Sequence, residues 1–144
     1  MSKKVTLISG FLLVGVLLGF YPIRTTDVPN WKLRVVNQDG IPYTGKEVTQ
    51  AWKNYTLETE PGQNFDVRVS DENGNVEFPE RRIDASLWKR LWLTVFNAAM
   101  TLAHGGFGVH AYVHANGPQG YASVEYVPGH APPSELVLPR ADTK

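Results

Sequence analysis

The feature that most constrains this chain is an apolar run without a charged residue at positions 5–20, close to the N-terminus. Its polar members are Thr6 and Ser9, whose hydroxyls can bond back to helix carbonyls. A basic pair, Lys3 and Lys4, precedes the run. Its length lies between a signal-peptide core of about 7–15 residues and a membrane-spanning helix of about 17–25.

The end of the run favours an anchor over a cleaved signal. No pair of small residues spaced by two stands there, since Leu17 lies two places before Gly19. We therefore expect residues 1–20 to be an uncleaved membrane anchor, with secretion after signal cleavage as the alternative. The basic pair predicts a cytoplasmic N-terminus and an extracytoplasmic remainder. Residues 21–30, which contain two prolines, are expected to be a linker.

Composition excludes several classes of function. The chain has no cysteine, which rules out a disulfide framework, a thiolate metal site and a catalytic cysteine. Its formal net charge is zero, which argues against nucleic acid as a partner. No sequence pattern indicates a bound cofactor, and the nucleophile motif G-x-S-x-G is absent.

Beyond residue 30, short segments alternate between apolar and polar residues, as half-buried strands do. In residues 31–35 the alternation directs Trp31, Leu33 and Val35 toward a core. In residues 65–69 the three apolar side chains face one way and the two charged ones the other. Further strands are expected at residues 47–57, 76–78, 109–115, 121–127 and 135–138, with turns at 38–40, 71–75 and 116–120.

Residues 82–100 follow a different pattern. Leu87, Leu91 and Val95 are spaced by four, which favours one or two helical turns around residues 85–92. Residues 92–96 are rich in aromatic and β-branched side chains and fit a helix or a strand equally well. We predict an all-β fold, namely a β-sandwich of about seven strands over residues 31–140. It would contain one short helical insertion and follow the N-terminal hydrophobic helix.

Two segments resemble the carboxypeptidase regulatory-like domain. The sequence LRVVNQDGIP at residues 33–42, with Gly45 and Val48, is similar to that family's first strand, D-G-x-P turn and second strand. The sequence SDENGNVEF at residues 70–78 looks like its T-D-x-x-G-x-[VF]-x-F hairpin. The resemblance implies a prealbumin-like, Ig-like sandwich and a non-catalytic extracytoplasmic accessory module. The family's closing strand pattern is missing after Pro79.

Three histidines form a candidate metal site. His104, His110 and His114 lie within eleven residues, and helical spacing would place the last two on one face. Residues 109–115 alternate as a strand, however, which would separate His110 from His114 by about 13 Å. Metal binding is therefore not the first hypothesis. It is kept as the alternative function, namely a protein that binds zinc or copper through these histidines.

A candidate partner-binding patch combines Arg81 and Arg82 with Trp88 and Trp92, because arginine and tryptophan dominate interface hot spots. The competing interpretation is an amphipathic segment that buries its tryptophans. We expect a non-catalytic, membrane-tethered module with a protein-binding or structural role. Its expected partner is another extracytoplasmic or membrane protein.

Overall fold

The computed structural model describes the backbone of residues 3–104, 107–117 and 120–139, and within these the side chains of 9–10, 12–98, 107–117 and 120–139. Two helices and nine strands occur in these residues. The helices are α1 (Lys3–Gly19) and α2 (Leu87–His104). The strands are β1 (Pro22–Val28), β2 (Trp31–Asn37), β3 (Glu47–Asn54), β4 (Asn64–Val69), β5 (Asn75–Phe78), β6 (Arg81–Ser86), β7 (Val109–Gly117), β8 (Gly120–Tyr126) and β9 (Glu135–Leu138).

Seven of these strands form a β-sandwich, as the sequence predicted. One sheet has the order β5-β2-β9 and the other β4-β3-β7-β8. The pairs are antiparallel except for β2 and β9, which run parallel. The core lies between the two sheets and includes Trp31, Val35, Phe78, Val113 and Leu136, all with no exposed surface.

The turn at residues 71–75 joins the two sheets and does not close a hairpin. Asp71 accepts hydrogen bonds from the backbone of residues 73 and 75, and Gly74 adopts a φ of 77°. However, β4 and β5 belong to different sheets. The turn packs on β2 instead, where the Val35 amide donates to the Gly74 carbonyl at 2.8 Å. A side chain at Gly74 would overlap that strand.

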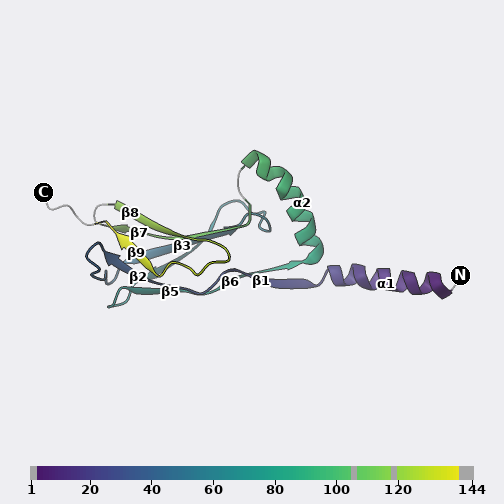
Figure 1. Cartoon of the computed structure of the whole chain (residues 1–144), viewed down its shortest axis with the longest axis horizontal. Helices are drawn as coiled ribbons and strands as arrows, with labels where there is room; N and C mark the ends of the chain where they lie inside the picture. Colours follow the sequence, from purple (N-terminus) through teal and green to yellow (C-terminus); the bar gives the residue numbers. More distant parts are fainter. Residues whose placement is uncertain (1–2, 105–106, 118–119, 140–144) are drawn as a thin grey trace.

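The segment expected as a linker, residues 21–30, contains a strand. β1 pairs with β6 in a separate two-stranded ribbon that extends from the sandwich toward α1 (Figure 1). Arg24 forms a bidentate ion pair with Asp84 across the ribbon, at 2.8 and 2.9 Å. Thr26 donates a hydrogen bond to Glu80. Because β1 and β6 are far apart in sequence, neither segment shows this pairing on its own.

The helical insertion is longer than the one or two turns expected. α2 runs from Leu87 to His104, and residues 92–96 are helical. The Ser86 hydroxyl accepts a hydrogen bond from the Lys89 amide at 3.2 Å, which caps the first turn. Figure 1 shows α2 turning sharply away from the line of α1. None of the helices in the described residues has the length and apolarity needed to cross a membrane.

Candidate functional site

Arg81, one of the four residues expected to bind a partner, is engaged inside the molecule. Its guanidinium lies over the Trp52 ring at 4.1 Å and its Nε donates to Gln50 Oε1 at 2.9 Å. Its Nη2 forms an ion pair with Asp66. Only 17% of its side chain is exposed. Arg81 therefore joins β6 to the four-stranded sheet.

The electrostatics of this cluster favour an ionised Asp66. Partial burial acts to raise the pKa of Asp66, but hydrogen bonds from Arg81 and Arg68 outweigh it and lower that pKa. Gln50 is fully buried, and its amide nitrogen has no hydrogen-bond partner among the described residues. Arg81 and Arg68 thus both balance the charge of Asp66.

The other three residues lie apart from Arg81. Arg82 is exposed and forms an ion pair with Glu80, whose pKa it lowers through their hydrogen bond. Trp88 and Trp92 lie on α2. The structure therefore brings the two tryptophans onto one helix and does not gather all four residues into one patch.

The two tryptophans belong to an exposed apolar stripe on α2. We call this surface the α2 stripe, and it consists of Trp88, Leu91, Trp92, Val95 and Phe96. Each of these side chains is between 41% and 71% exposed, with Trp92 the highest. The interpretation in which this segment buries its tryptophans does not describe this helix. Exposed apolar surface of this kind is typical of sites that contact protein or membrane.

The α2 stripe begins where α2 meets α1. The indole Nε1 of Trp88 donates to the Val16 carbonyl at 3.1 Å, which satisfies one of the free carbonyls at the end of α1. A side chain at Gly19 would overlap the Trp88 ring. Glycine at position 19 therefore permits this close approach between the two helices.

The histidines are distributed over two elements. His110 and His114 lie on β7, and the side chain of His104, at the end of α2, is outside the described residues. His110 packs edge-on against Tyr55 at 5.2 Å and lies 3.9 Å from Glu125. Among the residues described, no group of three His, Cys, Asp or Glu side chains could hold a metal ion.

A second apolar surface covers the outside of the four-stranded sheet. We call it the sheet face, and it consists of Phe65, Val67, Tyr112, His114 and Tyr121. The register places Phe65 and Tyr112 on either side of Ala51, and Val67 and His114 on either side of Thr49. The His114 ring lies between two tyrosines, 5.7 Å from Tyr112 and 5.4 Å from Tyr121.

The sheet face was not identified from the sequence as a functional surface. Phe65 is 62% exposed and Val67 is 53% exposed, whereas Asp66 points toward the Arg81 cluster. The alternation in residues 65–69 was clear, but it does not reveal which side faces solvent. The two charged residues of β4 were the available signal. On an edge strand such as β4, charged side chains can face inward if they have partners there, and the apolar side chains then face solvent.

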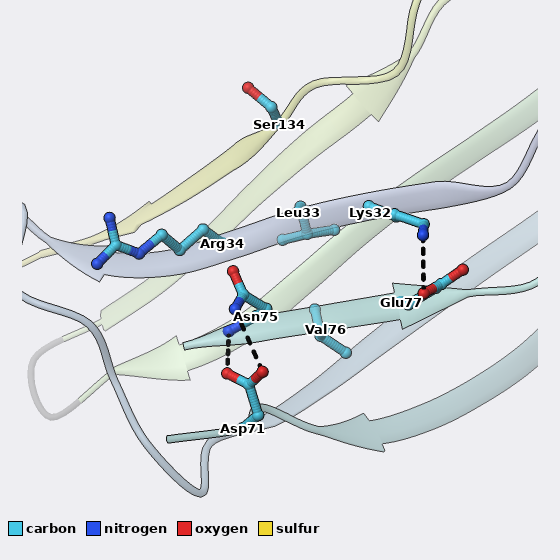
Figure 2. Close-up of a pocket in the computed structure, with 8 residues that line it drawn as sticks. All are labelled: Lys32, Leu33, Arg34, Asp71, Asn75, Val76, Glu77 and Ser134. Atoms are coloured by element: carbon cyan, nitrogen blue, oxygen red, sulfur yellow. Dashed lines mark hydrogen bonds and ion pairs between the residues drawn. The ribbon is translucent and has the colours of Figure 1, made fainter. Parts of the chain in front are cut away.

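A surface depression of about 320 Å³ lies along β2 and β5 (Figure 2). Its charged side chains already have partners within the chain. Lys32 pairs with Glu77 at 3.2 Å, Asp71 binds Asn75, and Arg34 donates to the Asn73 carbonyl. These contacts stabilise the two strands and the turn that precedes β5.

Beside α2 there is a shallow surface depression of about 330 Å³, lined by Asn54, Arg90 and Thr94 among others. Asp27 is 9% exposed and accepts a hydrogen bond from Asn54 Nδ2 at 2.9 Å. Burial raises the pKa of Asp27, although Asn54 and Arg90 favour its charged form. Asp27 is a buried acid between the ribbon and the sandwich.

Comparison with known protein families, curated proteins and solved structures finds no match to this chain. The function is therefore argued from the surfaces described above.

Proposed function

We propose that this protein is a non-catalytic module held at a membrane by α1, with its β-sandwich on the extracytoplasmic side. One observation carries the proposal. Among the side chains described in α1, the large apolar ones are exposed, and Leu12, Leu13, Leu17 and Leu18 each expose 60% or more of their surface. A helix that is apolar on every side is stable when lipid or protein surrounds it.

The charge distribution supports the same orientation. Lys3 and Lys4 precede the apolar run, which is the arrangement of a helix whose N-terminus stays in the cytoplasm. The ribbon of β1 and β6 then separates α1 from the sandwich (Figure 1). Membrane attachment at one end would leave the two sheets free to meet a partner.

We further propose that the sheet face binds another extracytoplasmic or membrane protein. This surface lies on the sandwich, on the far side of the ribbon from α1. An exposed cluster of aromatic and aliphatic residues favours a protein partner at that position. We also propose that the sandwich is of the Ig-like or prealbumin-like type, which the turn at residues 38–40 supports.

Flotation with lipid vesicles tests the membrane attachment. We expect the full chain to float with the vesicles and the double variant Leu12→Asp, Leu17→Asp to remain in the aqueous fraction. A charge at the bilayer centre costs about 3 kcal/mol per residue on insertion scales. Ile41→Asp is the matched control, since Ile41 is 60% exposed on the sandwich. Flotation of the double variant equal to that of the native chain would refute the proposal.

Photo-crosslinking in intact cells tests the sheet face. A photoreactive residue at Val67 should capture one recurrent membrane or extracytoplasmic protein, and Phe65→Ser should abolish that capture. The same probe at Glu72, in the turn before β5, is the control position. Capture that persists in Phe65→Ser, or that is equal at both positions, would refute this binding surface.

A further inference from the structure

The two sides of α2 differ in what they contact. On the inner side Leu93 is buried, and the Asn97 amide donates to the Thr56 carbonyl at 2.7 Å. Arg90 Nη2 donates to the Ile23 carbonyl at 2.7 Å, which ties the helix to the ribbon. The α2 stripe lies on the opposite side and is exposed along its length. The sandwich therefore fixes the helix and leaves its apolar side uncovered.

We propose that α2 lies along the surface of a lipid bilayer, with the α2 stripe inserted at the level of the headgroups. This inference rests on the proposed function, because it takes α1 to be in the same bilayer. It adds a second contact with lipid, made by an amphipathic helix that rests on the membrane and does not enter it lengthwise.

Continuity with α1 argues for lipid as the occupant. Trp88, the first residue of the α2 stripe, is hydrogen-bonded to Val16 in the last turn of α1. The exposed side chains of Phe20 and Tyr21 lie at the same junction, 65% and 70% exposed. The outer end of α1 thus marks the membrane boundary, where tryptophan and tyrosine accumulate.

Charge and direction agree with this placement. α2 contains the exposed Lys89 and no acidic residue, which suits a surface of anionic headgroups. Because α2 turns sharply away from the line of α1, it runs across the bilayer surface when α1 enters the bilayer lengthwise (Figure 1). The sandwich then lies on the aqueous side of α2.

The absence of cysteine in the chain allows a direct test, because a single introduced thiol can be labelled uniquely. A polarity-sensitive fluorophore is attached to Val95→Cys, within the α2 stripe, or to Thr94→Cys. Thr94 is exposed, lies outside the α2 stripe and lines the shallow depression beside the helix. Each full-length protein is added to vesicles with and without anionic lipid, some carrying nitroxide groups on the lipid.

We expect the label at position 95 to shift to the blue on vesicles and to be quenched several-fold more strongly by lipid nitroxides than the label at 94. Anionic lipid should strengthen this difference. If the protein floats with the vesicles while both labels respond alike, the inference is wrong and the attachment through α1 stands. If the protein does not float, the proposed function itself fails.

A third outcome identifies a different occupant. A blue shift at position 95 that grows with protein concentration and resists lipid quenching would show that a second copy covers the α2 stripe. This result would overturn the inference. Circular dichroism of both labelled variants, compared with the native chain, checks that the helix content is unchanged.

Discussion

At the scale of single residues, Arg81 shows how a residue type suited to binding can instead hold a fold together. Arginine next to tryptophan suggested a docking patch, and the sequence contains both. In the structure the Arg81 side chain instead contacts Trp52, Asp66 and Gln50 of the four-stranded sheet. Its neighbour Arg82 is exposed. Position in the strand decides between the two roles, since successive side chains point to opposite faces.

We therefore expect Arg81→Met to lower the free energy of unfolding by about 1–3 kcal/mol, because Gln50 would lose its hydrogen bond and Asp66 the less exposed of its two arginine partners. Arg82→Met should change it by less than about 0.5 kcal/mol, since Arg82 is exposed. Urea denaturation of the full chain in detergent micelles measures both values. Equal effects of the two substitutions would contradict the structural role of Arg81.

The second prediction at this scale concerns the buried acid Asp27. Burial raises its pKa, so the folded protein keeps this proton to a higher pH than the unfolded chain does. The free energy of unfolding therefore falls as the pH rises from about 4, the ordinary pKa of aspartate, through the raised value, and stays lower at neutral pH.

Asp27→Asn should remove this loss, since an amide oxygen can still accept from Asn54 and carries no charge. We expect the variant to be more stable than the native chain at pH 7 and equally stable below about pH 4. Denaturation across this pH range measures the difference. A variant that is less stable at neutral pH would show that the charged form of Asp27 is favoured in the folded state.

At the scale of elements, the sequence identified most strands but could not orient all of them. In β2 the alternation predicted both the strand and its buried face. Each of Trp31, Leu33 and Val35 is at most 3% exposed. The same alternation in β4 gave the strand without its orientation. The apolar side chains of β4 face solvent, because Asp66 faces inward and binds Arg81. Arg81 lies on β6, a strand that the sequence did not predict.

This reversal makes a prediction about β4. Phe65→Ser should change the free energy of unfolding by less than about 1 kcal/mol, because the ring is 62% exposed in the folded chain. Leu136→Ala, in the core, should cost about 2–5 kcal/mol. Urea denaturation of both variants in micelles compares them. If Phe65→Ser lowered the free energy of unfolding as much as Leu136→Ala, the prediction would be wrong, and the sheet face would be covered in the folded protein.

At the scale of the whole molecule, the sandwich could be predicted and its attachment to the helices could not. Short strands and glycine turns indicate a sandwich through local patterns. The ribbon depends on pairing between residues near 25 and residues near 83, which no local pattern encodes. The same applies to α2, whose apolar spacing predicts a buried face in a globular protein. In the structure these apolar residues form the exposed α2 stripe, because the sandwich and the ribbon contact the other side of the helix.

With α1 in a bilayer, as proposed above, the ribbon would set how far the sandwich stands from the membrane. β1 has seven residues, which at about 3.3 Å per residue gives roughly 20 Å. The turn before β5 lies farther out, beyond the start of β2 (Figure 1). If α1 enters the bilayer, the distance from lipid should increase from Ile23 through Lys32 to Glu72.

Single cysteines at these three positions, each labelled with a fluorophore, test this order on vesicles whose headgroups carry nitroxide. We expect strong quenching at position 23, weaker quenching at 32 and none above the aqueous background at 72. Ile23 is 43% exposed, so its label can meet a headgroup quencher. Comparable quenching at 23 and 72 would mean that the sandwich lies flat on the bilayer, and the ribbon would then not act as a spacer.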